Sequence, residues 1–388
     1  MSRFDKPTDR RDTLSYKWNV PDGVLPMWVA DMDFEAPEPV VEAIVDRAKH
    51  GIYGYTYTPD AFFEAVSNYY GRRHGFAFPT EWMIYSSGIV AAISSIVRWL
   101  TRPNENVLIQ APVYNIFYNS IINNGRRVLS SDLLYNDGEY SIDFADLESK
   151  LKDPQTSLMI LCNPHNPVGK IWSRDELASI GELAAKYGVI VLSDEIHCDL
   201  TLPGCEYTPF ASVNEVCANI AITAIAGSKT FNIAGLQSAV IAVKDGILRH
   251  RVCRGINTDE VGEPNAFSMT ANIAAFTRCD KWVDELREYI AENRRIATEY
   301  IQTNIEGLKV TQAEATYLLW VDISEVCSDS TIFAKFLYDE VGLYICDGLE
   351  YGECGRAFLR INLATRRQLV LEGMQRLEKG TKLFKSKR

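Results

Sequence analysis

Five short apolar segments follow one another between residues 106 and 244, and a clear helical pattern separates two of them. They are NVLIQAP (106–112), SLMILCNP (157–164), VIVLSDEI (189–196), IAITAIAGS (220–228) and SAVIAVK (238–244). The helical pattern SRDELASIGELAAKYG begins with a capping box, Ser173 with Glu176, and ends at Gly188. Strands that are apolar throughout and alternate with helices indicate a mostly parallel sheet covered on both faces. The sequence therefore predicts an α/β fold.

The pattern changes from about residue 280. The segment 279–305 predicts one long exposed helix, after which the strands YLLWVDI and FLRINLA alternate with helices. This is an α+β pattern. A chain of 388 residues is also too long for one ordinary core, because single cores stop growing at roughly 250–300 residues. We therefore predict a second domain.

Composition and charge argue against several classes of protein. The net charge of −11 disfavours a nucleic-acid partner, which requires basic patches. No apolar run approaches the roughly 20 residues of a membrane-spanning helix, and residues 1–18 contain no apolar signal segment. The nine cysteines form no C-x-x-C pair and the five histidines no H-E-x-x-H pattern, which disfavours disulfides and zinc. We expect a cytoplasmic protein with no membrane partner and no metal.

Four chemically distinctive segments stand where a predicted strand ends or a helix begins. CNPHNPVG, which contains Asn166, follows one strand, Asp194 ends a second, and Lys229 follows a third. SSGIVAAI, which contains Gly88, opens a helix. Ligands of open α/β sheets bind at the carboxyl ends of the strands. We therefore expect an asparagine, a carboxylate, a lysine and a glycine-led helix start to meet in one site.

Pyridoxal phosphate is a cofactor that uses all four of these groups. It forms a Schiff base with a lysine, an acidic partner keeps its ring nitrogen protonated, and its phosphate requires an anion site. Lysine is rarely fully buried unless a partner or a reaction uses it, and Lys229 follows an apolar strand. The sequence thus predicts a site for pyridoxal phosphate.

Six segments spread over nearly the whole chain carry a resemblance to a known family. They are LPMWVADMDF, YGYT, NPHNPVGKIWSRDEL, SDEIHCDL, SKTFNIAGL and FLRINLAT. With them the chain resembles the fold-type I pyridoxal phosphate enzymes of the class I/II aminotransferase superfamily, most of all the cystathionine β-lyase and cystalysin type of C–S lyase. The resemblance implies a large cofactor-binding domain (46–279) with a mostly parallel, seven-stranded type of sheet between helices. It also implies a smaller α+β domain (1–45 and 280–388) and a homodimer with shared active sites for a small amino-acid substrate.

Two catalytic residues follow from this resemblance. Lys229 is similar to the Schiff-base lysine, and Asp194 is similar to the aspartate at the ring nitrogen. The alternatives are a surface lysine after a strand and, for Asp194, a helix N-cap or turn residue. Asn166 resembles the donor to the ring hydroxyl, although Asn-Pro is also common turn chemistry.

The resemblance also implies further contacts to the cofactor. Gly88, Ile89 and Val90 resemble its phosphate loop, because backbone amides at a helix N-terminus bind phosphate and glycine permits close approach. Ser228 is a further cofactor contact by the same resemblance. Tyr114 is similar to the aromatic residue that stacks on the ring, with a core tyrosine as the alternative.

Four more residues complete the predicted site. Tyr55 resembles the tyrosine that reaches the phosphate of the neighbouring subunit, and core packing is the equal alternative. His197 stands where many aminotransferases carry a tyrosine near the ring hydroxyl, and a structural histidine stays open. Arg360 resembles the anchor of the substrate α-carboxylate, because a guanidinium pairs with a carboxylate through two hydrogen bonds. Its alternative is an interior ion pair. Ala30 is predicted as a second substrate contact.

The chain departs from the family pattern at several positions. Gln237 stands eight residues after Lys229, where many aminotransferases have an arginine at the phosphate. Ala226 replaces a serine, and Cys346 and Asp347 stand where a Pro-Gly pair is expected. Gln237 removes one positive charge from the site, which favours the lyase branch.

The resemblance implies a C–S β-lyase that cleaves cystathionine, cysteine or cysteine S-conjugates to a thiol, ammonia and pyruvate. An aminotransferase with the same residues is the alternative. A protein that holds pyridoxal phosphate without turnover is a third interpretation, which the filled catalytic positions disfavour.

Overall fold

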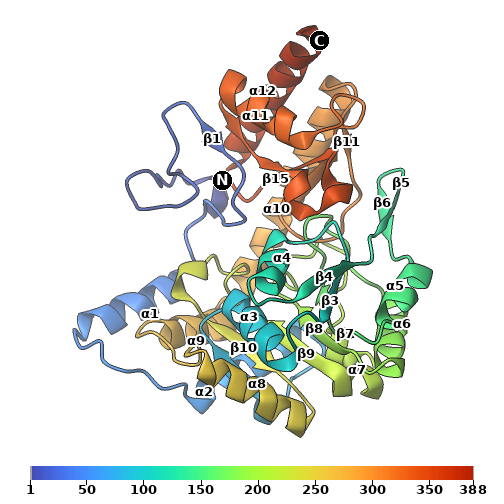
Figure 1. Ribbon diagram of the computed structural model, residues 1–388. Coiled ribbons are helices and arrows are strands. Elements are labelled where there is room, and N and C mark those ends of the chain that lie inside the picture. The colour runs from blue at the N-terminus through green and yellow to red at the C-terminus, as the bar shows by residue number, and fades with distance from the viewer. Residues whose placement is uncertain (1, 388) are drawn as a thin grey trace.

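A seven-stranded sheet forms the centre of the larger part of the molecule in the computed structural model, which describes residues 2–387 (Figure 1). Its order is β2-β10-β9-β8-β7-β3-β4. The bounds are β2 (Met83–Ser86), β3 (Asn106–Ile109), β4 (Arg127–Ser130), β7 (Thr156–Cys162), β8 (Ile190–Asp194), β9 (Ala221–Ile225) and β10 (Ala239–Ala242). Only β10 runs antiparallel to its neighbours among these strands. The predicted α/β fold is confirmed, and all five predicted strands lie in this sheet.

Helices cover both faces of the sheet (Figure 1). Successive residues of a strand point to opposite faces, so Val107 and Ile109 pack with α3, α4 and α8, whereas Leu108 packs with α2, α5, α6 and α9. This two-sided burial explains why the strands are apolar throughout. The helices of this part are α1 (Glu38–Lys49), α2 (Asp60–His74), α3 (Ile89–Leu100), α4 (Asn115–Ile122), α5 (Phe144–Leu151), α6 (Arg174–Lys186), α7 (Glu215–Ile220), α8 (Gly246–Thr258) and α9 (Ser268–Arg278).

Helix α6 begins as its sequence predicts. Ser173 Oγ accepts a hydrogen bond from the Glu176 amide at 3.2 Å, and the Glu176 carboxylate accepts one from the Ser173 amide at 2.8 Å. The helix ends before Gly188, which has a φ of +71°. Both ends are set by local chemistry, because the capping box satisfies free amides and glycine tolerates positive φ.

A four-stranded antiparallel sheet, in the order β11-β12-β15-β14, forms the second part of the molecule. Its elements are β11 (Lys309–Val310), β12 (Leu318–Asp322), β14 (Cys346–Asp347), β15 (Phe358–Asn362), α10 (Asp280–Asn304), α11 (Ser330–Val341) and α12 (Arg367–Ser386). The N-terminal segment joins this part, because β1 (Leu25–Pro26) pairs with β13 (Leu343–Tyr344). A hairpin of β5 (Leu134–Asn136) and β6 (Glu139–Ser141) projects beside it (Figure 1). The predicted domain limits stay a prediction, and the limit at 45/46 falls inside α1.

Helix α10 is not the exposed helix that its charged sequence predicts. Its N-terminal half buries Trp282, Val283 and Leu286 in the core around the large sheet. Its C-terminal half buries Ala297 and Ile301 in the core around the small sheet. The apolar residues recur three to four positions apart, so they form one stripe that the charges between them conceal. Helix α10 therefore joins the two cores.

Residues 10–34, here called the N-terminal strap, cross from the second part of the molecule to the large sheet. Asn362 on β15 donates its amide group to the carbonyl oxygens of Val29 and Asp31. Asn232 donates to the carbonyl oxygens of Met32 and Phe34. These bonds fix the path of the strap on both sides. Among residues 2–387, no helix has the length and apolar character required to span a membrane.

Candidate active site

A cavity of about 390 Å³ lies at the carboxyl ends of β7, β8 and β9. Most of the predicted site residues line it: Ala30, Gly88, Ile89, Val90, Tyr114, Asn166, Asp194, His197, Ser228 and Lys229. Arg360 lies next to this lining, where its Nη1 donates to Asn166 Oδ1 at 3.4 Å. Tyr55 lies elsewhere. The structure therefore brings together residues that are far apart in the sequence.

Lys229 is half-buried, and its side chain lines the cavity. Its Nζ donates a hydrogen bond to the carbonyl oxygen of Ala30 at 2.6 Å. Removal from water lowers the pKa of Lys229 to about 8, and the nearby charge of Arg360 adds to this effect. The negative charges of Asp31 and Asp194 act in the opposite direction. An amine with this pKa is partly neutral near pH 7, so it can accept a proton.

Asp194 is buried at the end of β8 and faces the same cavity. Its Oδ1 accepts a hydrogen bond from the Ile196 amide at 3.2 Å. Asp194 therefore also stabilises the turn that follows β8, which was the alternative role for this residue. Burial raises the pKa of Asp194 to about 6. A buried carboxylate is costly without a cationic partner, and the protonated ring nitrogen of pyridoxal phosphate would supply one.

His197 and Asn166 are both buried and both line the cavity. Burial, together with the charges of Lys229 and Arg360, lowers the pKa of His197 to about 3. The imidazole is therefore neutral at physiological pH. Its Nδ1 has no hydrogen-bond partner within residues 2–387, which leaves that atom for a ligand.

The first turn of α3 provides a site for an anion. Gly88 precedes the helix with a φ of +148°, a conformation that side-chain-bearing residues rarely adopt. The amides of Ile89 and Val90 belong to the turn whose N–H groups have no partner inside a helix. The buried Ser238 Oγ has no hydrogen-bond partner within residues 2–387, and it lines the cavity with Gln237. These groups suit a phosphate.

Arg360 is buried on β15 with its charge unpaired. Its Nη2 donates to the carbonyl oxygen of Trp28 at 2.8 Å and to Cys346 Sγ at 3.3 Å, and its guanidinium lies 4.9 Å from the ring centre of Tyr351. The hydrogen-bond partners found within residues 2–387 are neutral, so the alternative of an interior ion pair is wrong. A buried guanidinium without a carboxylate is suited to an anionic ligand.

The two predicted tyrosines differ in position. Tyr114 is half-buried in the cavity wall, and its ring packs edge-on against Phe117 at 5.7 Å. Tyr55 is fully exposed, at 103% of its reference area. The alternative of core packing for Tyr55 is therefore wrong, and contact with a neighbouring subunit stays a prediction.

Several neighbours of the predicted residues were not found from the sequence. The carbonyl oxygen of Trp28 and the thiol of Cys346 contact Arg360, and the Tyr317 hydroxyl donates to the Ala30 carbonyl at 2.9 Å. Trp28 lies in LPMWVADMDF, and Cys346 was noted as a departure from the family pattern. Their shared contact with Arg360 has no local signal, because it depends on strand pairing.

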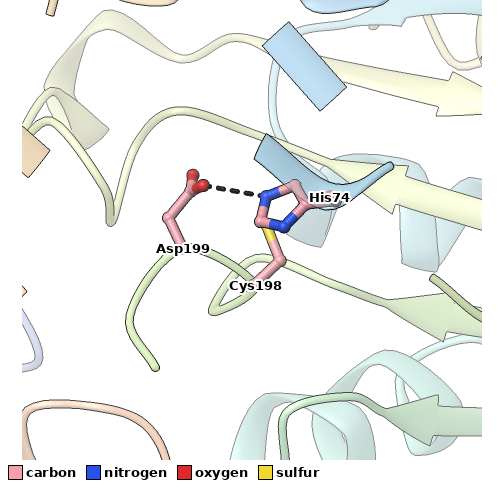
Figure 2. Close-up of side chains that lie close together, drawn as sticks. All are labelled: His74, Cys198 and Asp199. Atoms are coloured by element: carbon pink, nitrogen blue, oxygen red, sulfur yellow. Dashed lines mark hydrogen bonds and ion pairs between the residues drawn. The ribbon is translucent and has the colours of Figure 1, made fainter. Parts of the chain in front are cut away.

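A second cluster, formed by His74, Cys198 and Asp199, contacts the loop that carries Lys229. Figure 2 shows His74 at the end of α2 beside Cys198 and Asp199, whose ligating atoms lie within 4.8 Å of one another. Each already has a protein partner. His74 Nε2 lies 2.9 Å from Asp199 Oδ1, and Tyr70 bonds to Cys198. Thr230, next to Lys229, donates to Asp199 Oδ2 at 2.8 Å. We interpret the cluster as an anchor of this loop.

Comparison with known proteins relates the whole chain to one family. The family "Aminotransferase class I and II" matches residues 23–377. The cystathionine beta-lyase PatB of Bacillus subtilis (strain 168) is 42% identical in an alignment 384 residues long, which covers 97% of this chain and 98% of that protein.

Two solved structures resemble this chain over nearly its full length. Cystalysin of Treponema denticola, which contains pyridoxal 5'-phosphate, has a TM-score of 0.95 at 33% identity, covering 98% of this chain and 99% of cystalysin. A PLP-bound protein of Clostridium difficile 630, assigned as an aminotransferase, also has a TM-score of 0.95. It is 36% identical, and the match covers 98% of this chain and 100% of the Clostridium difficile chain.

The raised pKa of Asp194 predicts a pH-dependent effect of its removal. Because the folded-state pKa of about 6 exceeds the ordinary value of 3.8, protonation of Asp194 stabilises the fold at low pH, and this stability is lost as the pH rises to about 6. Asp194→Asn should therefore stabilise the cofactor-free protein at pH 7 by up to about 3 kcal/mol. Most of the gain should disappear near pH 4. Urea unfolding at both pH values measures it, and a variant that is less stable at pH 7 contradicts the burial argument.

Proposed function

The chain belongs to the aminotransferase class I and II family, and we propose that it is a pyridoxal-phosphate-dependent C–S β-lyase. Its substrates would be cystathionine, cysteine or cysteine S-conjugates, and its products a thiol, ammonia and pyruvate. The observation that carries the proposal is one cavity lined by Lys229, Asp194 and Asn166, with the unpaired guanidinium of Arg360 beside it. The likeness to PatB and to cystalysin supports the lyase over other activities of the family.

The cavity offers a partner to each functional group of pyridoxal phosphate. Lys229 would hold the cofactor covalently, and Asp194 would hold the proton of its ring nitrogen. Tyr114 would stack on the ring, and Asn166 would donate to the ring hydroxyl. The first turn of α3 would bind the phosphate. When bound, the cofactor withdraws the electron pair that proton removal leaves on the substrate α-carbon.

The remaining steps belong to side chains of this chain. Arg360 binds the α-carboxylate of the amino acid, which orients the α-hydrogen towards Lys229. The neutral Nζ of Lys229 takes this proton, as its lowered pKa permits. The electron pair of the former α-C–H bond then forms a Cα=Cβ double bond while the C–S bond breaks, and the sulfur leaves with the pair of the broken bond and takes up a proton to give the thiol. Water hydrolyses the released unsaturated amino acid to ammonia and pyruvate.

An aminotransferase is the second candidate, because the PLP-bound protein of Clostridium difficile assigned to that activity has the same fold. In it Lys229 would act as a proton donor as well as a proton acceptor, and no sulfur would be expelled. The two activities differ in their products and in their need for a keto acid.

The lyase predicts sulfur release without a second substrate. The purified holoenzyme should release pyruvate and a thiol from cystathionine with no added keto acid. Lys229→Ala should lose activity by at least about 10³-fold, as expected for loss of the proton acceptor. Lys244→Ala is the matched control, because Lys244 also follows a strand but pairs with Glu215 at the surface. Turnover that requires a keto acid and yields no thiol would identify an aminotransferase.

The proposed role of Arg360 predicts a substrate-binding defect. Arg360→Lys should lower kcat/KM by about 10- to 150-fold, because an ammonium cannot form the two-pronged contact with a carboxylate. The loss should be equal for cystathionine and cysteine, which share the α-carboxylate. Arg356→Lys, in an exposed ion pair of the same segment, is the control. A defect confined to cystathionine would instead assign Arg360 to the distal carboxylate.

A homodimer with shared active sites is part of the proposal. Ile52, Tyr55 and Tyr57 are exposed on the loop between α1 and α2, and exposed apolar patches mark interaction sites. Sedimentation should give twice the chain mass. Tyr55→Phe should weaken cofactor binding about 5- to 10-fold, as for one lost hydrogen bond, without changing that mass. A fully active monomer would rule out the shared site. The cytoplasmic location stays a prediction.

A further inference from the structure

The N-terminal strap carries four charged groups beside the active site. Lys17 is fully buried, with its Nζ 3.0 Å from Asp33 Oδ2 and 3.8 Å from Asp31 Oδ1. Arg10 reaches the other oxygens of both carboxylates, at 2.7 Å for Asp31 and 2.8 Å for Asp33. A buried lysine is costly unless it is paired. These ion pairs therefore fix the two carboxylates relative to the side chains of Arg10 and Lys17.

The two carboxylates are not equivalent. Asp33 accepts hydrogen bonds on both oxygens, from Arg10 and Trp18 on Oδ1 and from Lys17 on Oδ2. Asp31 accepts one from Arg10 on Oδ2. Its Oδ1 is buried and has no hydrogen-bond partner within residues 2–387. A buried carboxylate oxygen without a donor requires a reason.

The carboxylate of Asp31 acts electrostatically on the catalytic lysine. Ala30, which precedes it in the chain, accepts hydrogen bonds from Lys229 Nζ and the Tyr317 hydroxyl. The charge of Asp31 raises the pKa of Lys229, and it contributes with burial to the raised pKa of Tyr317. The other charges that act on Lys229 are Arg360, which lowers its pKa, and Asp194, which raises it.

Proton transfer to Lys229 creates a second cation next to Arg360. Asp194 is not free to balance it, because it would hold the protonated ring nitrogen when the cofactor is bound. The neighbouring His197 is neutral, since burial lowers its pKa to about 3. Asp31 is thus the remaining anion among the groups found to act on Lys229.

We propose that Asp31 is a positioning residue of the active site, whose carboxylate stabilises the protonated amine of Lys229. The inference rests on the proposed function, in which the α-carbon–hydrogen bond breaks and an N–H bond forms on Lys229. Arg10 and Lys17 hold the carboxylate in place, and Arg10 also moderates its charge. The strap therefore contributes to the chemistry in addition to lining the cavity with Ala30.

The proton affinity of Lys229 can be measured in the cofactor-free protein. Acetic anhydride labels neutral amines, and mass spectrometry of the Lys229 peptide over a pH series gives a midpoint near 8 for the unsubstituted chain. Asp31→Asn should lower this midpoint by roughly one pH unit, as expected for the removal of one negative charge that acts on the amine. Arg10→Gln should raise it by a smaller amount, because it removes a cation from Asp31. Circular dichroism checks the folding of each variant.

Opposite shifts distinguish an electrostatic role from a structural one. A strap that is merely loosened would move both midpoints in the same direction, and this result would overturn the proposal. An unchanged midpoint in Asp31→Asn would overturn it as well. If Asp31→Asn does not fold, Arg10→Gln decides: a raised midpoint supports the proposal and any other result rejects it. The labelling uses neither substrate nor cofactor, so its outcome is independent of whether the protein is a lyase.

Discussion

The register of the parallel strands β7, β8 and β9 positions the active-site residues of this molecule. Cys162 at the end of β7 is paired with Asp194 at the end of β8, and Asp194 is paired with Ala224 in β9. The segments that follow these strands therefore emerge at one edge of the sheet. Asn166 follows the first and Lys229 follows the third. A shift of register by one residue would turn Asp194 to the opposite face and remove it from the cavity.

The cavity balances charges that would be unstable if they were separated. The positive charge of Arg360 lowers the pKa of Lys229, and the negative charges of Asp194 and Asp31 raise it. Because burial weakens solvation, each of these interactions is stronger than at the surface. The protonation state of the site is thus set by four side chains from four separate segments of the chain.

Two devices hold these segments together. Helix α10 contributes to both cores, so the large and small sheets share one packed element. The strap is held by Asn362 on one side and by Asn232 on the other. It delivers the carbonyl oxygens of Trp28 to Arg360 and of Ala30 to Lys229. The buried Lys17 pairs with Asp33 along this path, and a path that kept the lysine buried without this partner would leave its charge uncompensated.

Local patterns in the sequence by themselves determined five of the seven strands of the large sheet, the capping box at Ser173 and the assignment of Lys229 and Asp194 to strand ends. Each is readable because periodicity, capping and strand ends involve residues close in the chain. Only the tertiary structure decided the burial of α10, the neutral hydrogen-bond partners of Arg360 and the exposure of Tyr55. Arg360 bonds to a carbonyl 332 residues away, and Lys229 bonds to one 199 residues away. Such contacts carry no local signal, because they arise from packing two cores against each other and from the path of a strap that distant side chains hold in place.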